Sequence, residues 1–148
     1  MPDVGLGLAS APEGFGLGKQ LPGSPAGVSP IEQAQAELGL TPQERMLYER
    51  HLENLNGPGK VMHPDGGIST LYQMSFEGPG GKVFNIPTVY GGKILSPEEA
   101  YAKANEYGLH FFPSYPDQKT AEERYQKMHG YMERDTQNFI RQQRLGGK

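Results

Sequence analysis

The sequence predicts an α+β fold: an extended, Gly/Pro-rich N-terminal arm, short helices, and one β-hairpin packed on two C-terminal helices. Three observations predict it. A helix-start motif, [ST]-P-x-E, recurs along the chain, and two runs rich in β-branched and aromatic residues lie between glycine turns. Gly 21 and Pro 13 together are about 23 % of the 148 residues, roughly twice their ordinary share. With 35 % hydrophobic residues, we expect a small, local core.

The N-terminal region has the most irregular composition. Seven Gly and five Pro fall within the first 30 positions, so no periodic apolar face is expected there. We divide the chain into an arm or linker with one short helix (residues 1–40) and a small α+β module with a C-terminal helix (residues 41–148). The arm has two interpretations. It is a linker, or it lays spaced apolar side chains such as Phe15 and Leu17 into a groove on a neighbouring protein and orders on binding.

Four predicted helices share one capping chemistry. Ser29, Thr41 and Ser96 each precede a proline and are followed three residues later by Glu. The hydroxyl accepts a hydrogen bond from a free backbone N–H, proline suits the first helical position, and Glu reaches back to the cap. Thr120 begins the same capping motif, with Glu three residues later but without the proline. The predicted helices cover residues 30–38, 42–55, 97–107 and 121–145.

The fourth predicted helix has a weak point at its middle. Gly130 costs about 1 kcal/mol there relative to Ala, so we expect a kink or break. Beyond it, residues 133–145 are highly polar. We therefore expect this last segment to project away from the core.

The hairpin is predicted from residues 68–76 and 83–90. Both runs are rich in β-branched and aromatic residues, which favour strands. The connection, residues 77–82, contains three glycines and suits a bulged hairpin. Pro87 has no N–H to donate, so the second strand should lie at a sheet edge or end there.

Catalytic and metal-binding patterns are weak in this sequence. His63 and Asp65 are two residues apart, but no third ligand follows at a known spacing, and Pro-Asp-Gly-Gly is typical of a turn. Phosphate-loop and nucleophile-elbow motifs are absent, as is cysteine. The histidines lie in separate segments of the chain: His51, His63, His110 and His129. We predict no catalytic residue, no cofactor and no metal.

The densest aromatic patch is Leu109-His-Phe-Phe-Pro-Ser-Tyr115. Phe111 and Phe112 could fill the core between hairpin and helices, or form an exposed contact patch, since aromatic residues are frequent interface anchors. The candidate interface residues from the whole sequence are Phe15, Leu17, Phe111, Phe112 and Tyr115.

Charge and hydropathy exclude two classes of partner. The formal net charge is −3, without the basic excess of a protein that binds nucleic acid. No apolar run approaches the roughly 20 residues of a membrane span. We therefore expect neither a membrane nor a specific nucleic acid as partner.

Residues 86–100 carry the most specific motif, Ile-Pro-Thr-Val-x-x-Gly-Lys-x-Leu-Ser-x-x-Glu-Ala. Together with Gly67-Ile-Ser-Thr-Leu-Tyr-Gln-Met-Ser-Phe and the later Ala-Glu-Glu-Arg-Tyr-Gln-Lys-Met-His, it resembles a small module in virion-associated proteins of tailed bacteriophages. The resemblance covers about residues 41–136. It implies no catalytic residue.

The resemblance implies a non-enzymatic structural component of a tailed-phage virion, in the head–tail junction or tail. Its partners would be other virion structural proteins (portal, adaptor or tail components), which the arm would contact, with multiple copies per particle. Absence of cysteine suits assembly in the bacterial host cytoplasm. The alternative is an internal virion protein ejected with DNA, or an accessory to a cell-wall-degrading enzyme. A third hypothesis is a hydrolase that uses His63 and Asp65.

Overall fold

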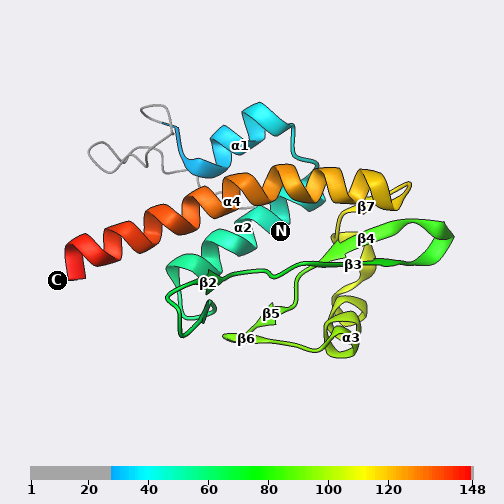
Figure 1. Cartoon of the computed structure of the whole chain (residues 1–148). Helices are drawn as coiled ribbons and strands as arrows, with labels where there is room; N and C mark the ends of the chain where they lie inside the picture. Colours follow the sequence, from blue (N-terminus) through cyan, green and yellow to red (C-terminus); the bar gives the residue numbers. More distant parts are fainter. Residues whose placement is uncertain (1–27, 148) are drawn as a thin grey trace.

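The computed structural model describes residues 28–147, which form a mixed α+β fold of four α-helices and small antiparallel sheets (Figure 1). Phe15 and Leu17 lie outside the described residues. The helices are α1 Pro30–Leu38, α2 Pro42–Asn56, α3 Pro97–Tyr107 and α4 Gln118–Gly147. Two short 3₁₀ helices accompany them: η3 Pro79–Gly81 and η4 Leu109–Phe111.

The strands are short and form three separate sheets within the described residues. They are β1 Val61–Met62, β2 Ile68–Ser69, β3 Met74–Glu77, β4 Val83–Ile86, β5 Val89–Tyr90, β6 Lys93–Ile94 and β7 Ser114–Tyr115. The largest sheet has the order β3-β4-β7, and two hairpins, β1-β2 and β5-β6, stand beside it. All pairings are antiparallel.

Helix α4 is in contact with several of the other elements. It contacts α1, α2, β4 and β7, with α1 and the main sheet on opposite sides of it (Figure 1). The central apolar cluster joins these layers and contains Ile31, Ala34, Leu40, Leu47, Tyr48, Leu71, Phe84, Ile86, Ala100, Ala104, Phe112, Met128 and Met132. Because α1 contributes Ile31 and Ala34, this helix packs within the module's core, although the sequence analysis grouped it with the arm.

The capping motifs place three helix starts where the sequence predicts them. Thr41 and Ser96 each accept the backbone N–H three residues on, and Glu44 and Glu99 accept the N–H of the capping residue in return. Ser29 caps α1 through its hydroxyl, which accepts from Glu32 N at 3.2 Å. Helices α1 and α3 have the predicted bounds, and α2 is one residue longer than predicted.

The predicted start and path of α4 need correction. The helix begins at Gln118 because Asp117 caps it: Asp117 Oδ1 accepts from Thr120 N at 2.8 Å. The expected break at Gly130 is absent, since α4 is continuous from 118 to 147. The polar segment after Glu133 does not simply project away, because Asp135 and Asn138 are buried.

The predicted two-strand hairpin is also shorter and more divided than expected. Only Met74–Glu77 and Val83–Ile86 pair with each other. Tyr72 adopts a left-handed φ of 45°, which ends strand geometry before β3. The run before it pairs with β1 instead, and Val89–Tyr90 pairs with β6. The second strand ends before Pro87, as predicted, but β4 is central because β7 pairs with its other side.

Within residues 28–147, no helix combines the length and apolar character needed to cross a bilayer.

Candidate interaction surface

Helix α3 is attached to the core by two small residues. Ala100 and Ala104 are fully buried, whereas most other residues of the helix face solvent. Because alanine allows close backbone approach but buries little area, α3 lies against the sheet with its outer face uncovered. In Figure 1 it lies below the sheet, on the opposite side from α4.

Three large aromatic side chains are exposed on α3 and η4. Tyr101 is 44 %, Tyr107 57 % and Phe111 52 % exposed. We call these three residues the α3 aromatic surface. Helical spacing places Tyr101 and Tyr107 on the two flanks of the buried Ala100–Ala104 stripe, about 120° apart. Exposed aromatic side chains are frequent anchors of protein contacts.

Neighbouring side chains hold two of these rings in place. The Tyr107 ring lies 6.4 Å from that of Tyr90, nearly parallel at 21°, and Arg50 lies 4.4 Å above Tyr90. The Tyr101 ring meets Phe76 edge-on at 4.9 Å. Rings fixed by their neighbours lose little side-chain entropy when a partner covers them.

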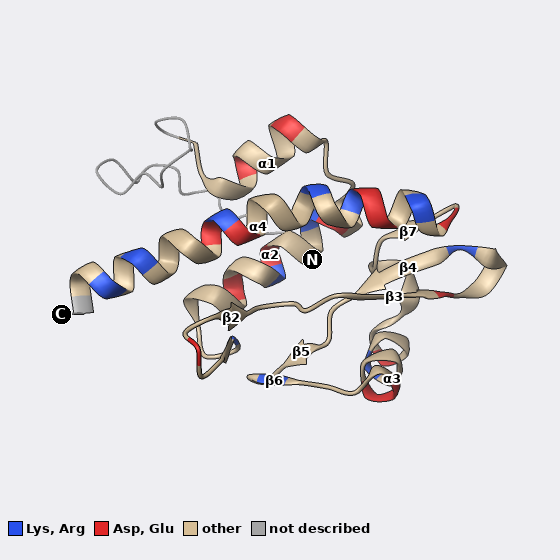
Figure 2. Cartoon of the chain, viewed as in Figure 1, with Lys and Arg blue, Asp and Glu red and all other residues tan. Residues whose placement is uncertain are grey.

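The solvent-facing side of α3 is charged. Figure 2 shows acidic and basic residues together on α3, where Glu98, Glu99 and Glu106 stand beside Lys103. The exposed aromatic residues therefore stand next to polar residues, a mixture that is also found at protein–protein interfaces.

The predicted aromatic patch divides between surface and core. Phe111 is exposed, but Phe112 is only 5 % and Tyr115 8 % exposed. Phe112 belongs to the central cluster, and Tyr115 donates its hydroxyl to Glu44 at 2.6 Å. Phe112 and Tyr115 are thus core residues in this fold, contrary to their selection as candidate interface residues. The burial of Tyr115 follows from β7, a two-residue strand that the sequence analysis did not anticipate.

Glu44 is the centre of a buried polar cluster. Its carboxylate accepts two bonds from Arg124, at 2.7 and 2.9 Å, one from Tyr115, and one from Thr41 N at 3.0 Å. Burial alone would raise the pKa of Glu44, but the hydrogen bonds from Arg124, Tyr115 and Thr41 outweigh it and hold that pKa below its ordinary value. The cluster joins α2, α4 and β7.

A second buried network joins α2, α4 and the segment after β2. Tyr48 donates to Asp135 at 2.5 Å, and His51 Nδ1 lies 2.6 Å from Thr70 Oγ1. His51 Nε2 lies 3.5 Å from Asp135 Oδ2. Burial, and then the neighbouring Asp135 carboxylate, raise the pKa of Tyr48 far above its ordinary value. Because Tyr48 and His51 have no exposed surface, this network serves the packing of α2 against α4.

The side chains of His63 and Asp65 both form hydrogen bonds within the turn between β1 and β2. His63 Nε2 lies 2.7 Å from Ser69 Oγ, and Asp65 Oδ1 accepts from Gly67 N at 2.9 Å. The backbone closes the same turn through His63 N to Gly67 O at 2.8 Å. The structure therefore gives both side chains the turn role that the sequence predicts. Among residues 28–147, no three His, Asp or Glu side chains gather as metal ligands.

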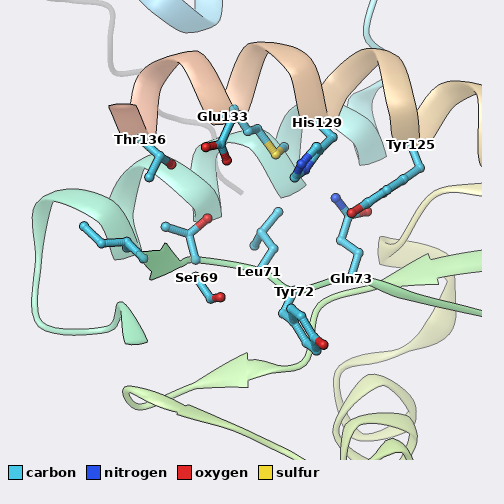
Figure 3. Close-up of a pocket in the computed structure, with 11 residues that line it drawn as sticks. Ser69, Leu71, Tyr72, Gln73, Tyr125, His129, Glu133 and Thr136 are labelled. Carbon is cyan, nitrogen blue, oxygen red and sulfur yellow. The ribbon is translucent and has the colours of Figure 1, made fainter. Parts of the chain in front are cut away.

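A groove runs between α4 and the extended segment 68–73. Figure 3 shows Tyr125, His129, Glu133 and Thr136 of α4 pointing toward that segment, with Gln73 directed back at Tyr125. The cavity here is about 270 Å³. A second cavity of about 160 Å³ shares Gln73 and Tyr125 with it, so the groove continues toward the start of α4. The sequence analysis did not find this groove, because its two walls lie about 60 residues apart in the chain.

Comparison with known protein families, with curated proteins and with solved structures finds no match for this chain.

Proposed function

We propose that this protein is a non-enzymatic structural component of a tailed-phage virion, in the head–tail junction or tail, where it docks on neighbouring virion proteins. The observation that carries the proposal is the α3 aromatic surface. Three exposed aromatic rings on α3 and η4, two of them held in place by neighbouring rings, suit a protein contact better than a substrate site.

The resemblance to virion modules supports the same conclusion. Its most specific stretch begins with Ile86-Pro-Thr-Val89, which is buried. Thr88 N and Val89 N both donate to Leu71 O, at 2.8 and 3.3 Å, so this stretch is tied to the core. The chain then turns through β5 and β6 into α3. The motif thus supplies a rigid base for the helix that carries the aromatic surface.

The polar residues that might suggest an enzyme have structural uses. Glu44 and Asp135 are buried in ion-pair and hydrogen-bond networks, and His63 closes a turn. A catalytic group needs access to substrate as well as a suitable pKa. These arrangements favour a structural role over a hydrolase that uses His63 and Asp65.

The test is to locate the chain in particles of the phage that encodes it. We expect the protein in purified full particles and, unchanged, in particles emptied of DNA. Loss on emptying would instead favour the ejected-protein alternative, and absence from both would overturn the proposal. A density map of the particle would show which virion proteins touch α3.

Variants test the surface itself. In full-length protein, Tyr107→Ala with Phe111→Ala should keep the fold but reduce incorporation into particles. Met62→Ala is the matched control, because Met62 is an exposed large apolar residue on β1 rather than on α3. Equal incorporation of both variants would show that the α3 aromatic surface is not the contact.

A further inference from the structure

The outer edge of β3 is unpaired in the main sheet. The strand order β3-β4-β7 leaves β3 with one hydrogen-bonded neighbour among the described residues. An edge strand presents free backbone N–H and C=O groups and can accept another strand.

The register shows which residues of β3 face this edge. Gly78 N donates to Lys82 O at 2.7 Å, which makes 78 and 82 a hydrogen-bonded pair. Antiparallel pairs alternate, so Phe76 and Met74 bond to β4 while the residues between them point outward. Asn85 N donates to Pro113 O at 3.1 Å, toward β7, which agrees with this alternation. The residues of β3 whose backbone N–H and C=O groups point outward are Ser75 and Glu77.

The two faces beside this edge differ in chemistry. On the α4 side, Ser75 Oγ accepts from Gln118 at 3.2 Å, and the 160 Å³ cavity also contacts Glu122 and Tyr125. That space is small and polar. On the opposite side lie Met74 and Phe76, both only partly buried, and Tyr101 of α3. An added strand would therefore meet apolar side chains on one face and a narrow polar space on the other.

The N-terminal arm contains a segment whose alternation of apolar residues and glycine matches the two faces beside the β3 edge. Residues 14–18 read Gly-Phe-Gly-Leu-Gly, so apolar residues alternate with glycine. In an extended strand, Phe15 and Leu17 would lie on one face and the three glycines on the other. Glycine permits the close approach that the α4 side demands, and Phe15 and Leu17 suit the face formed by Phe76 and Tyr101.

We propose that residues 14–18 of one copy add as a strand to the β3 edge of a neighbouring copy of this chain. The proposal deepens the proposed function and rests on it, because it names a second copy as one assembly partner. Helix α1, which follows the arm in the chain, lies on the far side of α4 from β3 (Figure 1), so an arm that paired with its own β3 edge would first have to pass around α4. Donation from copy to copy is a head-to-tail contact, which builds rings or filaments.

The acceptor variant is Ser75→Pro in the full-length chain. Proline at Ser75 removes the outward N–H, together with the side-chain hydroxyl, and leaves the backbone pairing to β4 in place. Ser75→Ala is its matched control, because it loses the hydroxyl bonded to Gln118 but keeps the N–H. The donor variant is Phe15→Ala with Leu17→Ala. Sedimentation velocity over a range of concentrations measures association of each protein.

We expect wild type and Ser75→Ala to associate, and Ser75→Pro and the donor variant each to remain monomeric. A mixture of the last two should associate again, because one supplies an intact arm and the other an intact edge. A mixture that stays monomeric, or self-association of Ser75→Pro alone, overturns the proposal. Monomeric wild type at every concentration also overturns it, including the case in which the arm pairs with its own β3.

Hydrogen exchange provides a second readout that does not depend on a variant. In wild type, the amides of Ser75 and Glu77 should exchange rapidly in dilute protein and become protected in the associated form, while Phe76 is protected in both. Unchanged exchange at Ser75 and Glu77 on association contradicts strand addition. Particle incorporation of Ser75→Pro separates the two proposals, since α3 docking can persist when copy-to-copy donation is lost.

Discussion

Arg124 donates two hydrogen bonds to the carboxylate of Glu44, 80 residues earlier in the chain, with Nη2 2.7 Å from Oε1 and Nε 2.9 Å from Oε2. The same guanidinium donates to Leu38 O at 3.2 Å. One side chain of α4 thereby joins the start of α2 to the end of α1. Planar, two-point contacts of this kind are among the stronger hydrogen bonds in proteins.

Replacing Arg124 with methionine should destabilise the protein strongly. Glu44 has no exposed surface, so the change leaves a buried carboxylate without its cation. We expect a loss of about 3–5 kcal/mol in the free energy of unfolding at pH 7. Urea denaturation measures it. Arg45→Met is the control: Arg45 pairs with the half-exposed Glu32, and its loss should cost about 1 kcal/mol or less.

The Glu44 cluster should also make stability depend on acid pH. The pKa of Glu44 is lower in the folded protein than its ordinary value of 4.5. A depressed carboxyl pKa contributes stability that is fully present above the unfolded value and is lost as pH falls through the folded value. Denaturation at pH 7 and at steps below pH 4.5 should therefore show a decline that is shallower in Glu44→Gln. The exposed Glu98→Gln serves as control, and a slope equal to wild type in Glu44→Gln would refute the assignment.

Tyr48→Phe removes a buried hydroxyl and leaves Asp135 with one fewer donor. Because both groups lie out of water, we expect a loss of about 1–3 kcal/mol. Thermal and urea unfolding give the value. Tyr101→Phe, on the exposed face of α3, should have no measurable effect. A neutral Tyr48→Phe would mean that the hydroxyl is dispensable to the network.

Adjacent phenylalanines should differ sharply in their contribution to stability. Phe112→Ala opens the central cluster and should cost about 3–5 kcal/mol, as large-to-small core substitutions do. Phe111→Ala, at an exposed position, should stay within about 0.5 kcal/mol. Similar costs at both positions would contradict the division of the patch into surface and core.

The start of α4 can be tested by its cap. Asp117→Ala removes the side chain that accepts from Thr120 N and should lower the melting temperature. Thr120→Ala should lower it less, because Thr120 lies inside the helix rather than at its cap. A larger effect of Thr120→Ala than of Asp117→Ala would instead support Thr120 as the helix cap, which is the start that the sequence alone predicts. Differential scanning calorimetry of the two variants and wild type is sufficient.

Local chemistry in the sequence was enough to place most helices. A hydroxyl, a proline and a glutamate within four residues determine where α1, α2 and α3 begin, and Gly39 and Gly108 follow the last residues of α1 and α3. Asp117 shows the limit of this reasoning. Both Asp117 and Thr120 are good capping residues, and the choice between them depends on how α4 meets the sheet, where Gln118 bonds Ser75.

Long-range contacts could not be predicted. Glu44 was expected only as a capping residue, yet its second carboxylate oxygen meets Tyr115 and Arg124 from distant segments. Strand β7 has two residues, too few for a periodic signal, and its pairing with β4 is what buries Tyr115. The groove of Figure 3 and the free edge of β3 follow from the same packing of distant segments.

The shared position of α4 has a consequence for synthesis of the protein. The hydroxyl of Tyr48 donates to Asp135, which is translated 87 residues later. At about 5–20 residues per second, roughly 4–17 s pass between their translation. During most of that interval α1, α2 and the sheet have no α4 to cover them. A nascent chain halted before residue 135 therefore exposes Leu47 and its neighbours, and such truncated products should be preferred clients of chaperones and proteases.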